Sequence, residues 1–489
     1  MDISTLTLDT PNSRPRYRQL YDVLATAIAS GDLPAGSRLP SERYLAAQLG
    51  VSRTTVVNAY RELESRGLVR GHVGRGTFVS ATPVSNDAPF AWRGKMALGA
   101  QRMIDPALHA LVRTTGAEII SFAPGVAALD HFPLDTFREL SDAVLRREPA
   151  ALALGPTEGQ PALRRVLAAR SGVRPEQVLI LAGAQQGLDL VARCLLDPGD
   201  TVVMDRPGYL GAIQPFRATG ARIVGWSIET GALDELEDAI VRYRPKFLYT
   251  NPTYQNPTGQ TLPIGARHEL LELAARYRLP IIEDGTYQDL GFAGKPPPAL
   301  RELDDQGLVI SINTFSKTLA PGLRLGWLIA PESIVDQLAL IKARADVFSA
   351  GLMQLVIAEF LVGRRYDDHV RALSAEHARR HEVMLTALRH EVAPGNLSVS
   401  PATGGLFLWG RLNGEIEARD LLDKALAVGV TFVPGEQFYP DGGGKYELRL
   451  CFSSAAPEQI VAGVRRLAPL LAAPQTVRRD RVSGHQPLV

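Results

Sequence analysis

The sequence contains little lysine, little cysteine and no long apolar run. Only seven of its 53 basic residues are lysines, so chemistry that requires a primary amine has few candidates. The two cysteines, Cys194 and Cys451, lie in apolar runs, which favours reduced packing residues over a disulfide or a reactive thiol. No apolar stretch approaches the roughly eighteen residues of a membrane span, the first residues lack a signal-peptide pattern, and no metal-ligand spacing occurs. We therefore expect a cytoplasmic protein with no metal site and no membrane contact.

The net charge of +1 hides two oppositely charged parts. Residues 11–80 contain ten arginines, five acids and no lysine, so this segment carries +5 and the remainder about −4. A length of 489 residues with 45% hydrophobic and 21% charged residues excludes a disordered or fibrous chain. The predicted organisation is a basic module over 11–80, a linker over 81–91, a larger acidic module over 92–475 and a polar tail over 476–489.

Capping residues mark the helix boundaries of the basic module. Apolar residues recur at helical spacing over 16–30, and turn residues follow them. Ser41 and Gly50 then bracket a short helix, and Ser52 precedes another helix that stops at Gly67. Short apolar runs on both sides of a glycine-rich tip predict a two-stranded wing. The pattern is that of a helix-turn-helix followed by a hairpin.

The second helix of this pair has two different faces. Val56, Tyr60 and Leu63 recur at i, i+4 and i+7 and predict a packed face, whereas the opposite face is polar and cationic. Insertion of the capped helix end into the DNA major groove is one interpretation. A small helical oligomerisation module with a solvated polar face explains the charge pattern equally well.

The segments LPSERYLA at 39–46 and VSRTTV at 51–56 resemble the winged-helix domain of GntR-type bacterial regulators. The resemblance covers nearly all of residues 14–80 and implies that the partner is a double-stranded DNA operator. The residues that it implies in DNA contact are Arg43, Ser52, Arg53, Thr54, Thr55 and the wing backbone at Gly74. Charge and position add Arg38 and Arg75 as phosphate contacts.

The acidic module is predicted to be an α/β domain with a mostly parallel sheet. Short apolar runs alternate with helical patterns, which is the arrangement of such folds. The runs are 178–181, 201–204, 247–250, 280–282 and 309–312. Because ligands gather at the carboxyl ends of the strands in these sheets, the loops that follow the runs form the candidate site.

Side chains with suitable chemistry follow each run. The first run leads into a helix whose free N–H groups suit a phosphate. The later loops contribute a ring, an amide, a carboxylate, a phenol and an amine: Tyr209, Asn256, Asp284, Tyr287 and Lys317. Taken singly, each of these residues is also compatible with an ordinary loop or packing role.

Together these groups match the needs of pyridoxal phosphate. A lysine amine forms the Schiff base, a carboxylate keeps the pyridine nitrogen protonated, and arginine with hydroxyl groups neutralises the phosphate. A surface lysine after a core strand is the alternative for Lys317, and the neighbouring Asp284 and Tyr209 disfavour it. We therefore predict pyridoxal phosphate as the cofactor and Lys317 as the catalytic residue.

From about residue 95 to 470 the chain resembles the fold-type I aminotransferases, especially the aminoadipate/kynurenine-type branch. The resemblance includes SFAPG at 121–125, GGLFLW at 404–409 and VPG at 433–435. It implies a large domain with a mostly parallel sheet and a small α+β domain. The implied ring contacts are Asp284 to the pyridine nitrogen, Asn256 and Tyr287 to the ring hydroxyl, and Tyr209 stacked on the ring. The implied phosphate contacts are Ala184, Gln185, Thr314, Ser316 and Arg324.

Two further positions bear on a substrate. The resemblance implies that Arg449 grips the α-carboxylate of an amino acid, and a salt bridge at a strand edge is the alternative for it. Where such enzymes often have a tyrosine that reaches the cofactor phosphate of the partner subunit, this chain has Leu154. The departure removes a hydrogen bond to the phosphate, which predicts weaker cofactor retention and argues against full catalytic competence.

A GntR-type winged helix joined to an aminotransferase-like domain resembles the MocR family of bacterial regulators. The resemblance implies a homodimeric, pyridoxal-phosphate-dependent transcription regulator that senses an amino compound or the cofactor itself. A working amino-acid aminotransferase that carries a DNA-binding module is the second hypothesis. A DNA-binding scaffold with a vestigial pocket is disfavoured, because all the residue types that would contact the cofactor are present except the tyrosine that Leu154 replaces. The sequence leaves the effector, the operator and the direction of regulation open.

Overall fold

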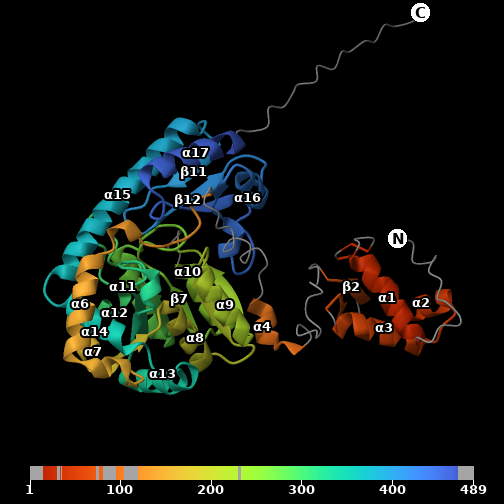
Figure 1. Cartoon of the computed structure of the whole chain (residues 1–489), viewed down its shortest axis with the longest axis horizontal. Coiled ribbons are helices and arrows are strands. Elements are labelled where there is room, and N and C mark those ends of the chain that lie inside the picture. Colours follow the sequence, from red (N-terminus) through yellow and green to blue (C-terminus); the bar gives the residue numbers. More distant parts are fainter. Residues whose placement is uncertain are drawn as a thin grey trace, which may run out of the picture. The chain divides into compact units, whose positions relative to one another are not determined.

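The chain folds into two compact units, residues 1–101 and residues 102–489, which Figure 1 shows in the colours of the sequence. The computed structural model describes residues 15–29, 33–34, 36–65, 67–72, 76–80, 95–103, 119–228 and 233–471. The wing tip with Gly74 and Arg75, the predicted linker 81–91 and the predicted tail 476–489 lie outside the described residues. None of the helices in the described ranges is long and apolar enough to cross a membrane.

The first unit has the predicted order of helices and hairpin. Its elements are α1 (Arg16–Ala29), α2 (Glu42–Leu49), α3 (Arg53–Ser65), β1 (Val69–His72) and β2 (Gly76–Val79). The backbone N–H of Tyr44 donates to Ser41 Oγ at 3.3 Å, and Gly50 ends α2 with a φ of 60°. The backbone N–H of Thr55 donates to Ser52 Oγ at 3.1 Å. The predicted capping residues are therefore confirmed.

The core of the first unit lies between α1, α2 and α3. Leu20 and Leu24 of α1 are fully buried with residues of the other two helices. The predicted packed face of α3 is confirmed, since Val56, Tyr60 and Leu63 are all buried. The Tyr60 hydroxyl also donates to the carbonyl of Pro40 at 2.9 Å, which ties α3 to the start of α2.

The second unit is built on a seven-stranded sheet with the order β4-β10-β9-β8-β7-β5-β6. The strands are β4 (Val178–Leu181), β5 (Thr201–Asp205), β6 (Arg222–Trp226), β7 (Phe247–Thr250), β8 (Ile281–Asp284), β9 (Val309–Thr314) and β10 (Gly326–Ile329). The block from β6 to β9 is parallel, and β10 pairs antiparallel with both β9 and β4. The predicted mostly parallel sheet is confirmed. β6 and β10 were not predicted: β6 is a half-exposed edge strand, and β10 takes its place by pairing with β4, which is far away in the sequence.

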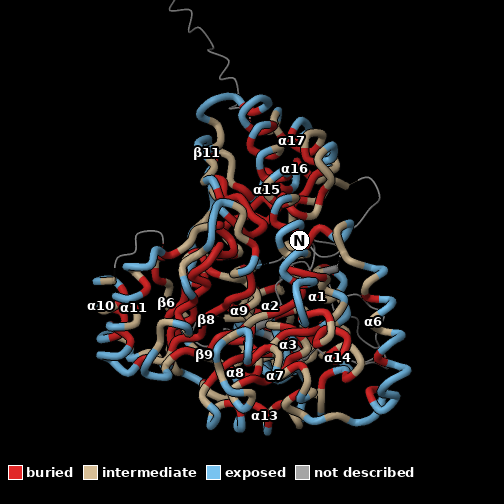
Figure 2. The backbone as a smooth tube through the Cα atoms, turned by 90° about the vertical axis from the view of Figure 1, so that its left-hand side faces the viewer, coloured by how far each residue is buried: buried red, intermediate tan, exposed pale blue. Residues whose placement is uncertain are grey.

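Helices cover both faces of this sheet, which explains why its strands read as continuous apolar runs. Alternate residues of β4 point to opposite sides, so that Leu179 packs with α8, α9 and α13 whereas Ile180 packs with α7 and α14. A third cluster packs α10, α11 and α12 on β7 and β8. The helices are α6 (Leu134–Arg147), α7 (Pro161–Ser171), α8 (Ala184–Leu195), α9 (Leu210–Thr219), α10 (Leu233–Tyr243), α11 (Ile264–Tyr277), α12 (Leu300–Leu303), α13 (Glu332–Ala345) and α14 (Gly351–Leu361). In Figure 2 the buried residues follow the strands inside this helical layer.

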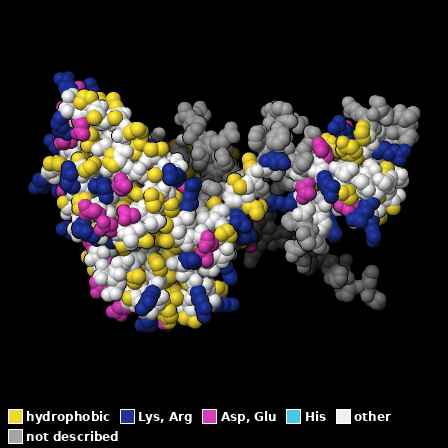
Figure 3. All heavy atoms as spheres, turned by 90° about the horizontal axis from the view of Figure 1, so that it is seen from below, with side chains coloured by type: hydrophobic (Ala, Val, Ile, Leu, Met, Phe, Trp, Pro, Cys, Tyr) yellow, Lys and Arg dark blue, Asp and Glu magenta, His cyan; other side chains and the backbone are white. Residues whose placement is uncertain are grey.

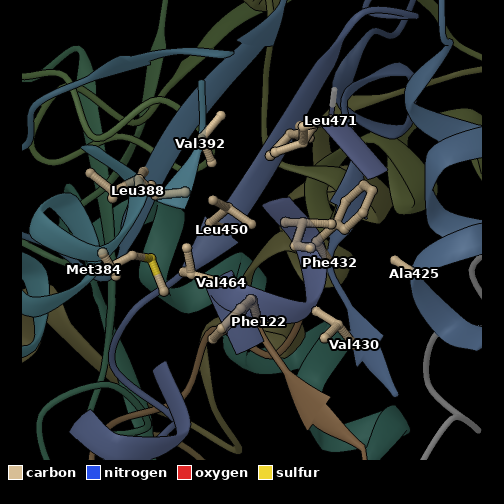
Figure 4. Packing of buried hydrophobic residues seen from close by; sticks show 14 of the residues in the cluster. Phe122, Met384, Leu388, Val392, Ala425, Val430, Phe432, Leu450, Val464 and Leu471 are labelled. Atoms are coloured by element: carbon tan, nitrogen blue, oxygen red, sulfur yellow. The ribbon is translucent and has the colours of Figure 1, made fainter. Parts of the chain in front are cut away.

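A second, smaller sheet carries the chain after residue 391. It has the order β11-β12-β15-β14, with β11 (Leu397–Ser400), β12 (Phe407–Leu412), β14 (Val433–Pro434) and β15 (Glu447–Cys451). The long helix α15 (Arg365–Glu391), together with α16 (Ala418–Ala427) and α17 (Pro457–Leu471), packs on it. Figure 4 shows part of this cluster, in which Met384 of α15, Leu450 of β15 and Val464 of α17 meet. The short strand β13 (Val430–Thr431) pairs parallel with β3 (Ile120–Ser121).

Candidate cofactor site and DNA-binding face

The carboxyl ends of the parallel strands bring the predicted cofactor residues together. Asp284 is the last residue of β8, and the loop after it carries Tyr287. Tyr209 follows β5 and Asn256 follows β7, while Lys317 lies three residues beyond the end of β9. This placement follows from the parallel topology, because the ends of β5, β7, β8 and β9 all meet at one edge of the sheet.

Asp284 is held in place by three neighbouring groups. The Tyr249 hydroxyl donates to its Oδ2 at 2.8 Å, and the Thr286 backbone N–H donates to its Oδ1 at 3.1 Å. Asn251 Nδ2 donates to the backbone carbonyl of Asp284 at 2.5 Å. Burial raises the pKa of the Asp284 carboxyl, and the hydrogen bonds from Thr286 and Tyr249 oppose that shift. A buried carboxylate of this kind suits the partner of a cationic ring nitrogen.

A chain of hydrogen bonds links the two sheets at the site. Arg449 Nη1, from β15 of the small sheet, donates to Asn256 Oδ1 at 2.8 Å. Asn256 Nδ2 in turn donates to the Tyr287 hydroxyl at 3.3 Å. The Arg449 guanidinium lies 4.2 Å from the ring centre of Phe407 and 5.0 Å from that of Phe438. Arg449 is therefore a buried cation inside the site, so the structure contradicts the strand-edge alternative for it.

The position of the Tyr209 ring requires a glycine at residue 211. A Cβ atom on Gly211 would approach the Tyr209 ring to 2.4 Å, so any side chain there would displace the ring. Burial, reinforced by the negative charge of Asp284, raises the pKa of the Tyr209 hydroxyl to about 12. The ring therefore packs against the start of α9 and lies near the Asp284 carboxylate, where a stacking platform is required.

Lys317 points into the same space. Its Nζ donates to the backbone carbonyl of Gly125 at 2.6 Å. Burial, reinforced by the positive charges of Arg449 and Arg324, lowers the pKa of Lys317 to about 8, against an ordinary value of 10.5. Because the neutral amine is the nucleophile, this environment activates Lys317 near neutral pH.

The lowered pKa predicts a pH profile for the reactivity of Lys317. The amine is mainly protonated below pH 8 and mainly neutral above it, so its modification should rise through about pH 8 rather than 10.5. The measurement is reductive methylation of cofactor-free protein with formaldehyde and cyanoborohydride, followed residue by residue by mass spectrometry from about pH 6.5 to about pH 10, a range that brackets both values. A Lys317 profile with its midpoint near the ordinary lysine value would contradict the prediction.

The predicted phosphate residues surround the start of α8. Gly183 precedes this helix with a φ of 100°, and the free N–H groups of Ala184 and Gln185 begin it. Arg324 Nη2 donates to the Ala182 carbonyl at 2.7 Å, which places the guanidinium beside the same turn. Thr314 Oγ1 donates to Ser316 Oγ at 3.0 Å. We call the residues Ala184, Gln185, Thr314, Ser316 and Arg324 the phosphate cradle.

These residues fit pyridoxal phosphate. The cradle offers backbone N–H groups at a helix N-terminus, two hydroxyls and a guanidinium, which together suit a phosphate. In addition, Arg449 Nε is buried without a hydrogen-bond partner among the described residues, so an acceptor is still required there. The donor set thus accommodates a phosphate at one end and a carboxylate at the other.

Three residues of the site were not assigned from the sequence. Tyr249 is inside β7, Asn251 directly follows that strand, and Asp205 ends β5 and accepts the Asn251 backbone N–H at 2.7 Å. Asn251 and Asp205 could have been assigned to the site from their position at strand ends. Tyr249 gave none, since an apolar run with a tyrosine predicts only packing.

Leu154 lies in a segment that faces outward. It follows the short helix η4 (Pro149–Leu152), and its exposed fraction is 85%. Leu152, two residues earlier, is 71% exposed. Two large apolar side chains of this segment are therefore exposed.

The predicted DNA-binding residues of the described chain lie on the first unit, where all but the half-buried Thr55 are exposed. Arg43 lies on α2, and Arg53, Thr54 and Thr55 occupy the first turn of α3 after Ser52. Arg53 Nη2 forms an ion pair with Glu42 at 2.8 Å and keeps an exposed fraction of 62%. The backbone of Arg38 pairs with Phe78 of β2, and its guanidinium lies close to Gly76. Lys and Arg side chains project from this unit on the face seen in Figure 3.

Comparison with known proteins identifies both units. Residues 119–467 match the model of aminotransferase class I and II, and residues 16–79 match that of bacterial regulatory proteins of the gntR family. A 2-aminoadipate transaminase of Thermus thermophilus is 37% identical over 390 residues, which cover 78% of this chain and 98% of that protein. The probable rhizopine catabolism regulatory protein MocR of Rhizobium meliloti is 31% identical over 452 residues, which cover 89% of each chain.

A solved structure shows the same fold for the second unit. LysN, the α-aminoadipate aminotransferase of Thermus thermophilus in complex with N-(5'-phosphopyridoxyl)-L-leucine, superposes with a TM-score of 0.74. It is 36% identical, and the match covers 78% of this chain and 98% of that one.

Proposed function

Because this chain belongs to the aminotransferase class I and II family and carries a gntR-family regulatory domain ahead of it, we propose that it is a pyridoxal-phosphate-dependent transcription regulator of the MocR type. The observation that carries the proposal is the joining, in one chain, of a cofactor pocket around Lys317 to a winged helix with an exposed Arg53. The ligand of the pocket is an amino compound or the cofactor, and the output is a change in operator binding.

The chain's residues have distinct roles toward the cofactor in this proposal. Lys317 would hold the aldehyde carbon, Asp284 would pair with the ring nitrogen, and the phosphate cradle would hold the phosphate. When bound, pyridoxal phosphate supplies an electrophilic carbon for amines and a ring that accepts electrons. Asn256 and Tyr287 would hold the ring hydroxyl, and Tyr209 would pack on the ring. Burial around Asp284 excludes water and strengthens these electrostatic contacts.

Arg449 selects ligands that carry a carboxylate. It comes from the small sheet and donates to Asn256 of the large domain, so that a carboxylate bound at its unpartnered Nε also joins the two parts of the second unit. A bidentate guanidinium–carboxylate pair is stronger than a neutral hydrogen bond. Such a ligand favours the closed arrangement of the small sheet over the pocket, and differential affinity of this kind is what a regulatory response requires.

A titration with amino acids tests this function. Purified protein loaded with pyridoxal phosphate receives amino acids one at a time, while the absorbance of the cofactor and the mobility of operator DNA in a gel are followed together. A stable change in both supports the regulator. No cofactor absorbance in the loaded wild-type protein would refute the proposal.

Arg449→Met tests the carboxylate role of Arg449 in the same titration. We expect a loss of about 30- to 100-fold in apparent affinity for amino acids, the size of one charge-assisted pair, and little change for amines without a carboxylate. Arg411→Met is the matched control, because Arg411 lies on the neighbouring strand β12 with its side chain exposed. Equal affinity for amino acids in the Arg449→Met and Arg411→Met proteins would refute the carboxylate role.

An active aminotransferase is the second candidate. The 2-aminoadipate transaminase relative, whose length is covered almost completely, favours it. Addition of a keto acid after the amino acid distinguishes the two functions, since sustained turnover to product supports the enzyme. Leu154 in place of a tyrosine at the phosphate weakens cofactor retention and favours the regulator.

We further propose that the protein is a homodimer that works in the bacterial cytoplasm and on the nucleoid. A dimer presents two winged helices and therefore binds two half-sites of a DNA operator. The exposed Leu152 and Leu154 support the presence of a protein contact on the second unit.

A further inference from the structure

A buried lysine outside the cofactor pocket needs a physical reason. Lys342 of α13 has a side chain with 0% exposure. Burial lowers the pKa of Lys342, and the hydrogen bond and negative charge of Asp346 oppose that shift. A buried ammonium is strongly unfavourable unless an anion and hydrogen bonds compensate it. Lys342 Nζ donates to Asp346 Oδ1 at 3.0 Å, so the buried charge is paired.

The second oxygen of Asp346 is bound by the helix of the phosphate cradle. Gln186, in the first turn of α8, donates from Nε2 to Asp346 Oδ2 at 2.7 Å. The Oε1 of Gln186 accepts the backbone N–H of Ala182 at 2.8 Å. Gln186 therefore holds both the loop before α8 and the carboxylate of Asp346. We name Gln186, Lys342 and Asp346 the α8 brace; α13, which carries Lys342, packs beside α8 (Figure 1).

The α8 brace is anchored on its other side as well. Asp346 ends α13, and its backbone N–H donates to the Lys342 carbonyl at 3.0 Å. The Val347 carbonyl after it accepts the Thr157 hydroxyl at 2.9 Å. Thr157 follows the exposed Leu154 closely in the chain. One short loop thus connects the start of α8 with the outward-facing segment of the second unit.

We propose that Lys342 and Asp346 are positioning residues for the phosphate cradle. They act through Gln186 and set the direction of the first N–H groups of α8, on which anion binding at a helix N-terminus depends. Lys342 also neutralises Asp346, so the cradle does not face an uncompensated carboxylate when a dianionic phosphate binds. This inference rests on the proposed function, because it takes the phosphate of pyridoxal phosphate as the ligand of the cradle.

Gln186→Glu tests the brace without removal of buried volume. The substitution keeps an oxygen for the Ala182 N–H but places a carboxylate against Asp346, so the link breaks by repulsion. We expect the Kd for pyridoxal phosphate to rise about tenfold, the size of one charge-assisted hydrogen bond. We expect inorganic phosphate to compete correspondingly less well. Gln306→Glu is the matched control, because Gln306 also donates to an aspartate, Asp305, but on an exposed loop.

The double variant Gln186→Glu/Asp346→Asn separates positioning from a general structural effect. The amide introduced at position 346 donates to the carboxylate introduced at position 186, and its carbonyl oxygen accepts from Lys342. The link therefore returns with the opposite direction of donation. We expect the Kd of the double variant to return to within about threefold of wild type, with thermal unfolding showing that all variants are folded.

Three outcomes overturn the brace: wild-type Kd in Gln186→Glu, an equal loss in Gln306→Glu, or no recovery in the double variant. If Gln186→Glu does not fold, Asp346→Asn alone, at a side chain 28% exposed, gives the test, with weaker binding expected and unchanged binding contradicting the proposal. Wild-type protein that takes up no pyridoxal phosphate refutes the proposed function instead.

Discussion

Lys317→Ala is expected to abolish covalent retention of pyridoxal phosphate. Of the lysines that the structure describes, Lys317 is the one that lies among Asp284, Tyr209 and the phosphate cradle. Its pKa of about 8 makes the amine reactive near neutral pH. Alanine removes the bond-forming nitrogen and leaves the noncovalent contacts. The expected result is loss of the cofactor's visible absorbance after desalting and loss of cofactor mass after borohydride reduction.

The control for this prediction is Lys246→Ala. Lys246 forms an ion pair with Asp200 at 3.5 Å and lies at the opposite end of the sheet from the site, before β7. Its variant should retain the cofactor as wild type does. Retention of reducible cofactor by the Lys317→Ala protein would show that another amine forms the bond.

Lys317→Ala should also uncouple the two units. We expect Lys317→Ala to bind operator DNA with wild-type affinity in the absence of ligand, because no residue of the winged helix is altered. Its operator binding should no longer respond to the amino compound. A preserved response would place the sensing site elsewhere in the chain.

Arg53→Ala is expected to remove specific operator binding. Arg53 is at the N-terminus of α3, the end that enters the major groove in helix-turn-helix proteins, and its side chain is 62% exposed. The ion pair with Glu42 holds the guanidinium at that end. Loss of a bidentate base contact costs about 1–3 kcal/mol, which corresponds to about 5- to 150-fold in affinity. The measurement is a gel shift at fixed salt with operator and random DNA of equal length.

Arg138→Ala provides a matched control, because Arg138 is also an exposed arginine with a nearby acid, Asp135, at 3.4 Å. It lies on α6 of the second unit and should leave DNA binding unchanged. The ratio of operator to random-DNA affinity should fall for Arg53→Ala, whereas loss of a phosphate contact alone would weaken both equally. Normal operator binding by Arg53→Ala would refute the assignment of α3 as the recognition helix.

Much of the fold could be predicted because it depends on local patterns. Ser41, Ser52 and Gly50 mark helix ends through bonds and dihedral angles that involve only residues close in the chain. The parallel strands are recognised because sheets buried on both faces require continuous apolar runs. β10 was missed because its place beside β4 is decided by pairing with a strand far away in the sequence.

The sequence by itself determined the residue types of the cofactor site and their attachment to strand ends, since parallel strands deliver their following loops to one edge. Only the tertiary structure decided how these residues act on one another. The chain of hydrogen bonds from Arg449 through Asn256 to Tyr287 joins segments up to 193 residues apart. The ion pair between the buried Lys342 and Asp346 was not predicted, because a lysine on a helix is ordinarily solvated. The role of this ion pair depends on Gln186, because the packing of α13 beside α8 brings Gln186 within hydrogen-bonding distance of Asp346.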